Sequence, residues 1–338
     1  MENMENTYKV CIKCFTFNQA NYIEDAMHGF VMQQTDFPYV AAVVDDASTD
    51  GEPEVIKRFL EKEFDMASAV QDETEDYVRV VAKHKTNVNC TFVVVFLKYN
   101  HYSIRKARIP YFKDWYDNVK YIAMCEGDDY WTDPLKLQKQ VDILEKDETL
   151  MACVTNCSVV DNNGKTIKDV RGGVVKNDIE GRYNLRHFFN SNHQYPTLSA
   201  VYRNSHPKEV GEKTRIMSNS YLGDWTLWIA LHCFGDFYFL NEATCAYRIN
   251  PTSLTHSNSI KRRIGLAKEN FRLLPAVASV LPEGFEDIQK NLRENTAWMW
   301  WDLGHAYFKA HKYFKAFECV YKWGLKKFSY LFKAKIKK

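Results

Sequence analysis

The sequence lacks several features that would assign the protein to a class directly. No window approaches eighteen uninterrupted apolar residues, and the first residues, MENMENTYKV, contain no basic stretch followed by an apolar one. A large net charge is also missing, because 45 Lys and Arg against 43 Asp and Glu leave +2. We therefore expect a cytoplasmic protein that does not span a membrane and is no general nucleic-acid binder.

The cysteines show no disulfide framework. The nine cysteines are odd in number and scattered along the chain, unlike those of a disulfide-rich secreted protein. Cys11 and Cys14 have the CxxC spacing of a metal or redox site, but they lie in an apolar run and have no second CxxC partner. We expect both to be buried free thiols of a protein in a reducing compartment.

The chain does contain enough apolar sequence for a large core, with 46% hydrophobic residues among 338. Apolar runs of strand length alternate with amphipathic helical segments. The expected strands are 8–15, 39–44, 77–82, 92–97, 121–125 and 151–160, and the expected helices are 21–34, 54–63 and 135–145. This alternation predicts an α/β fold with a mostly parallel sheet flanked by helices. The strand at 92–97 is expected inside an irregular insertion, 86–117.

From residue 259 the pattern is helical to the end. We predict two parts, an α/β domain at 1–258 and a helical C-terminal extension at 259–338. Trp300, Leu303, Gly304 and Tyr307 partly match the tetratricopeptide pattern. Since a single copy cannot bury a continuous core, we favour a helical hairpin.

Carboxylates gather where two of the expected strands end, in VVDDASTDG and in AMCEGDD. In an extended chain Glu126 and Asp128 point to the same side. At an effective dielectric of about 20, charges about 4 Å apart repel by roughly 4 kcal/mol. Mn²⁺ or Mg²⁺ would relieve this repulsion, because carboxylates are suitable ligands for both. Ligands of open α/β sheets bind beyond strand ends, so both turns are candidate sites, with a solvated turn as the alternative.

Four segments together carry a resemblance to a known family. They are FTFN at 15–18, VVDDASTD at 43–50, EGDDYW at 126–131 and GDW at 223–225. In this order they resemble the family 2 glycosyltransferases of the GT-A fold, over about residues 8–255. The resemblance implies an inverting, metal-assisted hexosyltransferase of the bacterial polysaccharide type. Such an enzyme moves a sugar from a nucleotide-diphosphate sugar, usually a UDP-sugar, to a glycan or lipid-linked acceptor.

The resemblance also implies roles for single residues. The family's donor nucleotide-binding positions are matched by Thr16, Asn18, Asp46, Asn100, Lys106 and Glu126. Asp128 and His256 match the metal ligands, and Asp224 matches the base that takes the proton of the acceptor hydroxyl. Glu126 stands where the D-x-D motif has Asp, and Gly223 where an acid is commoner. From the residues alone, Lys106 could also lie in a solvated basic loop, and Asp224 could be a helix-terminal acid.

Two other functions remain open. A sugar nucleotidyltransferase would need a glycine-rich phosphate loop after the first strand, and FNQAN at 17–21 contains no glycine. A catalytically silent sugar-nucleotide-binding protein would bind UDP without turnover. The presence of both Asp128 and Asp224 argues against this second reading.

The C-terminal tail is basic and aromatic. From Lys312 to the end, nine lysines stand against one acid, Glu318. One expectation is peripheral contact with the inner face of the plasma membrane, near a lipid-linked acceptor. The alternative is a solvated helix that packs its aromatic face on the core.

Overall fold

The computed structural model describes residues 8–171, 179–191, 195–218, 223–249, 260–294 and 297–336. The chain divides into two compact units, 1–207 with 235–250, and 208–234 with 251–338. The predicted domain boundary at residue 258 stays a prediction. The two compact units divide the chain differently, because residues 208–234 belong to the same unit as the C-terminal helices.

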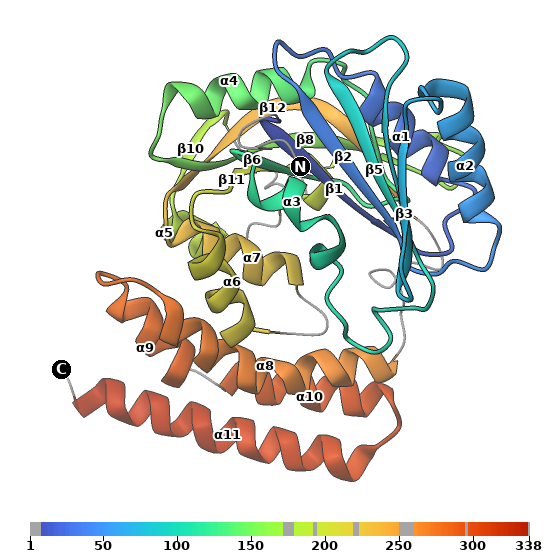
Figure 1. Cartoon of the computed structure of the whole chain (residues 1–338). Helices are drawn as coiled ribbons and strands as arrows, with labels where there is room; N and C mark the ends of the chain where they lie inside the picture. The colour runs from blue at the N-terminus through green and yellow to red at the C-terminus, as the bar shows by residue number, and fades with distance from the viewer. Residues whose placement is uncertain are drawn as a thin grey trace. The chain divides into compact units, whose positions relative to one another are not determined.

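A twelve-stranded sheet forms the first unit (Figure 1). Its order is β10-β12-β8-β11-β6-β1-β2-β5-β4-β3, and β7 and β9 pair with β12 and β8. The strands are β1 Val10–Thr16, β2 Tyr39–Asp45, β3 Val70–Glu73, β4 Tyr77–Lys83, β5 Cys90–Leu97, β6 Tyr121–Met124, β7 Tyr130–Trp131, β8 Leu150–Val160, β9 Thr166–Arg171, β10 Gly181–Tyr183, β11 Val201–Arg203 and β12 Asp236–Arg248. The central strands β6, β1, β2 and β5 are parallel, and so is the β8–β12 pair. The remaining pairs are antiparallel.

Helices of the first unit cover the sheet (Figure 1). They are α1 Ile23–Val31, α2 Glu52–Glu63, α3 Lys113–Asp117, α4 Lys136–Lys146 and α5 Leu185–Ser191, with short 3-10 helices at Ile109–Phe112 and Thr197–Ser199. Alternate residues of β1, namely Val10, Ile12 and Cys14, join the main core because side chains of a strand alternate between faces. Apolar residues of α1, α2 and α4 complete the same core, including Phe30 and Phe59.

Strand β5 lies in a different setting from the predicted one. The sequence indicates an irregular insertion around it, whereas β5 occupies the sheet between β2 and β4. All of its residues except Phe96 are buried. A strand that is buried on both faces forms a continuous apolar run, so the unbroken apolar run of β5 was a signal of its central position. The irregular residues on both sides of the run led to the prediction of an insertion instead.

The CxxC cysteines are buried free thiols, as expected. Burial raises the pKa of Cys11 to about 12. Burial is also the main cause that raises the pKa of Cys14 well above its ordinary value, and the carboxylates of Glu52 and Glu126 add to it. The reading of these residues as core thiols is confirmed.

The second unit is helical. Its helices are α6 Pro207–Ile216, α7 Gly223–His232, α8 Ile260–Val280, α9 Glu286–Glu294, α10 Ala297–Lys309 and α11 Tyr313–Ile336. Helices α10 and α11 lie side by side as a hairpin (Figure 1). Leu303, Tyr307 and Cys319 belong to a small core between them, and Gly304 permits close packing because a Cβ there would lie 3.2 Å from Cys319 Cβ. Within the described ranges, no helix is long and apolar enough to cross a membrane.

Candidate active site

Four loops leave the carboxyl ends of the central parallel strands. They are 17–22 after β1, 46–51 after β2, 98–108 after β5 and 125–129 after β6. From β1 the chain moves outward through β2 to β5 and then returns to β6 on the other side of β1. The ends of β1 and β6 therefore form a topological switch point, where ligands of open α/β sheets bind.

The acidic turn after β6 packs directly against the end of β1. A Cβ on Gly127 would lie 2.3 Å from Thr16 Oγ1 and 2.5 Å from Gln19 Oε1. Any residue other than glycine would therefore push the turn away from β1. The Gly127 N–H also donates to the Phe15 carbonyl at 3.3 Å. The structure thus brings Thr16 and the predicted Glu126-x-Asp128 motif together at the switch point.

Burial is uneven along the acidic turn. Glu126 is exposed, Asp128 is half-buried and Asp129 is buried. Burial raises the pKa of Asp128 above its ordinary value, opposed by its own N–H, the Arg248 charge and a hydrogen bond from the Gln19 side chain. The pKa of Asp129 is raised well above its ordinary value, first by burial and then by the Asp128 charge. Burial thus disfavours the charged form of both carboxyl groups.

Arg248, at the end of β12, fixes the backbone of the acidic turn. Its N–H donates to Asp129 Oδ1 at 2.8 Å, and its Nε donates to the Asp128 carbonyl at 2.9 Å. The same guanidinium binds Asp25 Oδ2 at 2.7 Å and the Asn162 carbonyl at 3.0 Å. Arg248 is almost completely buried, so these acceptors hold it in one orientation. No sequence pattern indicates this role, because the partners of Arg248 are far apart along the chain.

Asp46 is fully buried and is held by the loop after β5. Its carboxylate accepts the N–H groups of His101 at 2.6 Å and Tyr102 at 3.0 Å, and Arg108 Nη1 lies 3.4 Å away. Asn100 Nδ2 donates to the Asp46 carbonyl at 3.0 Å. In this structure Asp46 and Asn100 therefore position the 98–108 loop. The predicted contact of both with the donor stays a prediction.

Asn18 links the loop after β1 to the loop after β2. Its N–H donates to Ser48 Oγ at 2.8 Å, and its Oδ1 accepts the Thr49 N–H at 2.8 Å. Asn18 and Ala47 both adopt left-handed backbone conformations, with φ of 53° and 62°. Such conformations are uncommon for residues other than glycine and cluster at ligand sites.

Glu52 is a buried carboxylate that the sequence analysis did not single out. It accepts hydrogen bonds from the Thr16 hydroxyl, from the Gln19 N–H at 2.9 Å and from Ser48 Oγ at 2.8 Å. Burial raises its pKa, and these hydrogen bonds oppose the rise. The only signal was an acid in the first turn of a helix, which favours the helix dipole in any protein.

Two basic residues of the 98–108 loop have different surroundings. Lys106 Nζ binds Asp76 Oδ2 at 2.8 Å and the Tyr99 hydroxyl at 2.5 Å. Arg108 lies over the Phe15 ring at 4.1 Å from its centre. Burial lowers the Arg108 pKa, and the charges of Asp46 and Glu126 oppose this. Arg108 is thus the basic side chain of this loop that lies between the two acidic turns, although the sequence favoured Lys106.

Asp224 and His256 are not part of these four loops. Asp224 is exposed in the first turn of α7, which belongs to the helical unit. His256 lies outside the described residues. Among the residues that the structure describes, no group of three or more His, Cys, Asp or Glu is arranged to hold a metal ion. The assignments of Asp224 as base and of Asp128 and His256 as metal ligands therefore stay predictions.

Comparisons with known proteins identify similar chains and a similar fold. No family model matches the sequence. The chain is 26% identical over 296 residues to the uncharacterized protein Rv1520 of Mycobacterium tuberculosis, covering 87% of this chain and 74% of the relative. The same figures hold for the uncharacterized protein Mb1547 of Mycobacterium bovis.

Among solved structures, S. aureus TarS 1-349 has a similar fold, with a TM-score of 0.50 and 12% identity over 89% of this chain and 72% of that one. The mannosyltransferase PcManGT from Pyrobaculum calidifontis, in complex with GDP-Man and Mn²⁺, gives a TM-score of 0.49 and 16% identity over 89% and 74%. The predicted α/β fold of the GT-A type with C-terminal helices is confirmed by the sheet and by the likeness to TarS.

Proposed function

We propose that the protein is a cytoplasmic glycosyltransferase of the family 2 type. It transfers a hexosyl group from a nucleotide-diphosphate sugar of the UDP-sugar type to a hydroxyl of a glycan or lipid-linked acceptor, with inversion. The observation that carries this proposal is the close packing of the acidic turn against Thr16 at the switch point of the sheet. Ligands of this class of sheet bind at that point.

The acidic turn fits Mn²⁺ or Mg²⁺. Carboxylate oxygens are the ligands that both ions accept, and one or two suffice because water and substrate phosphates complete the shell. Asp128 is the first candidate ligand, since burial raises its pKa and a cation would offset that cost. His256 is proposed as a further ligand and Glu126 as the acid near the ribose. When bound, the ion would stabilise the negative charge of the departing nucleoside diphosphate as a Lewis acid.

The chain's own residues supply the other requirements of transfer. Thr16 and Asp46 are proposed to shape the nucleobase pocket, with Asn18 beside them. Arg108, and Lys106 if its loop rearranges, would neutralise diphosphate oxygens. Asp224 would take the proton of the acceptor hydroxyl. The hydroxyl oxygen of the acceptor then bonds to the anomeric carbon of the sugar, while the bond between that carbon and the diphosphate breaks. Attack from the face opposite the diphosphate gives inversion.

The test is nucleotide release from a panel of UDP- and GDP-sugars, with and without Mn²⁺, in the presence of an acceptor glycan extract. We expect metal-dependent release from at least one UDP-sugar. The Asp224→Asn variant should bind that donor with parental affinity and lose about 100-fold or more in transfer. Glu209→Gln is the matched control, because Glu209 is also an exposed acid in the first turn of a helix.

Two results of these assays would contradict the proposal. Tight UDP binding with no turnover of any donor would favour a catalytically silent sugar-nucleotide-binding protein. Transfer by Asp224→Asn at the parental rate would remove Asp224 from the role of base.

A further inference from the structure

The helical hairpin of α10 and α11 presents apolar side chains on its outer surface. We define its aromatic face by the exposed residues Trp301, Phe308, Phe314, Phe317, Tyr321 and Leu325. Phe314 is 84% exposed and Phe317 is 73% exposed. Large apolar side chains in such a cluster indicate an interaction surface, whereas scattered ones do not.

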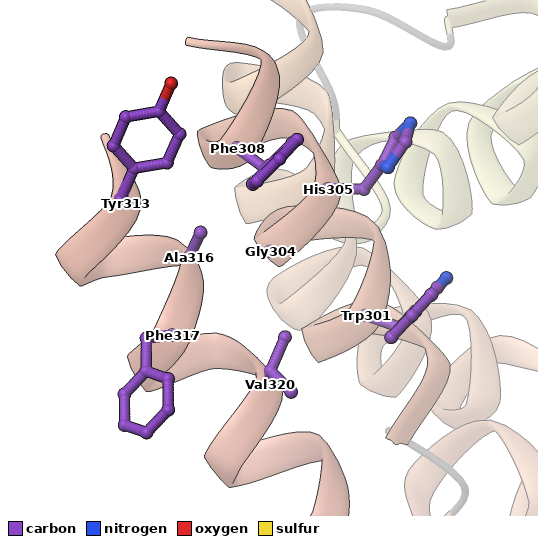
Figure 2. Close-up of a pocket in the computed structure, with 8 residues that line it drawn as sticks. All are labelled: Trp301, Gly304, His305, Phe308, Tyr313, Ala316, Phe317 and Val320. Carbon is purple, nitrogen blue, oxygen red and sulfur yellow. The ribbon is translucent and has the colours of Figure 1, made fainter. Parts of the chain in front are cut away.

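Part of the aromatic face lines a cavity that both helices form. A cavity of about 450 Å³ runs between them, lined by Trp301 and Phe308 of α10 and by Phe317 of α11 (Figure 2). Gly304 and Ala316 keep the helices close along it. Phe314 and Tyr321 lie near Phe317 on α11, because residues three and four apart share one side of a helix.

Lysines run alongside this face. Phe314, Tyr321 and Leu325 are each followed directly by a lysine, and those lysines are Lys315, Lys322 and Lys326. The lysines share the spacing of the apolar residues, so they form a parallel stripe about a quarter turn away. Over residues 297–327 six lysines stand against two acids, and one of these acids, Glu318, is paired with Lys322 at 2.6 Å.

We infer that this face lies on the surface of an anionic lipid bilayer. An apolar stripe with flanking lysines suits the interfacial plane, because aromatic side chains enter the headgroup region while lysine ammonium groups meet lipid phosphates. The stripe of lysines would repel the same stripe on a second copy of the chain, and it complements a negatively charged surface. This inference goes beyond the transferase proposal and adds Trp301 and Phe308 of α10 to the membrane contact expected of the tail.

The experiment is sedimentation of the full chain with vesicles of phosphatidylcholine alone or with 30% phosphatidylglycerol. We expect binding to the anionic vesicles only, and weaker binding at higher salt. Phe314→Ser/Phe317→Ser and, separately, Lys315→Glu/Lys326→Glu should each lower the bound fraction at least fivefold. The matched controls, Val70→Ser/Val88→Ser and Lys62→Glu/Lys83→Glu, change exposed residues of the first unit and should bind as the parent does. Thermal melts establish that every variant is folded.

Equal binding by parent and face variants, or no binding to anionic vesicles, overturns the inference. A dimer in solution that Phe314→Ser/Phe317→Ser converts to a monomer, without vesicle binding, overturns it in favour of an interface between copies. Because no donor or acceptor is present, none of these outcomes depends on transferase activity.

Discussion

The two acidic turns at the carboxyl edge of the sheet hold their carboxylates in opposite ways. In the turn after β2, Asp46 and Glu52 are buried and accept several hydrogen bonds from neighbouring loops. In the turn after β6, Glu126 is exposed, and burial raises the pKa of Asp128 against weaker opposing contacts. The first turn thus positions the neighbouring loops through Asp46 and Glu52, whereas the second turn leaves the Glu126 carboxylate exposed.

The difference shows that acidic residues clustered in a turn can have different roles. A buried carboxylate with backbone donors stabilises loop geometry, because each N–H that it satisfies would otherwise be left without a partner. A partly buried carboxylate with few donors instead favours binding of a cation. Variants of the two turns should therefore separate loss of activity from loss of stability.

The largest expected effect is that of Asp128→Asn. If Asp128 is a metal ligand, this variant should lose about 100-fold or more in metal-dependent nucleotide release, because the neutral amide is a poorer ligand and the turn's charge is reduced. Its thermal midpoint should stay at or above the parental value, since a carboxylate with a raised pKa is replaced by a neutral group. Release rates across a Mn²⁺ titration, together with thermal melts, measure both. Parental activity at all Mn²⁺ concentrations would contradict the assignment.

Asp46→Ala should lower the stability of the fold, whereas Asp128→Asn should lower activity without lowering stability. Removal of this buried acceptor leaves the N–H groups of His101 and Tyr102 without their partner, at a cost of about 2–4 kcal/mol in the free energy of unfolding. Urea denaturation measures this loss, and limited proteolysis should reveal cleavage within the 98–108 loop. Asp50→Ala, at an exposed position of the same turn, is the control and should cost less. Equal losses in the two variants would remove the structural role of Asp46.

Gly127→Ala probes the contact between the acidic turn and β1. The added methyl would approach Thr16 Oγ1 to 2.3 Å, and the buried Thr16 side chain cannot move away freely. We expect a loss of about 1–3 kcal/mol in stability and about a tenfold loss in donor binding, as the turn shifts. Gly211→Ala in α6, where a Cβ meets nothing within 4 Å, should be neutral or slightly stabilising. Isothermal titration with UDP and urea melts of both variants make the comparison.

The smallest effect concerns pH. Burial raises the pKa of Asp45 from 3.8 to about 6. The folded state thus binds the proton more tightly than the unfolded state, so this contribution to stability is full below about pH 4 and is lost as pH rises through 6. Asp45→Asn removes this dependence, so the stability of the variant relative to the parent should rise as pH increases from 4 to 7. Urea melts at each pH measure the difference, and a constant difference would contradict the assignment.

The sequence predicted six strands of the first unit, β1, β2, β4, β5, β6 and β8, because their apolar runs are bounded by turn residues, and it predicted the helices α1, α2 and α4. It indicated an irregular insertion around β5, and it missed β3, whose VQDE sequence has little apolar character. At the site it located Thr16 and the acidic turn together, since both follow parallel strands. It could not show which groups Arg248 and Glu52 bind, because their partners lie as far as 223 and 36 residues away.

The buried cysteines can report local opening of the fold. Eight of the nine are buried, and several have raised pKa values, as with Cys11 and Cys153 at about 12. Thiolate, the species that reacts with alkylating reagents, is therefore scarce while the sheet stays closed. For a cysteine on a strand, the alkylation rate would then report how often that strand separates from its neighbours, without any added label.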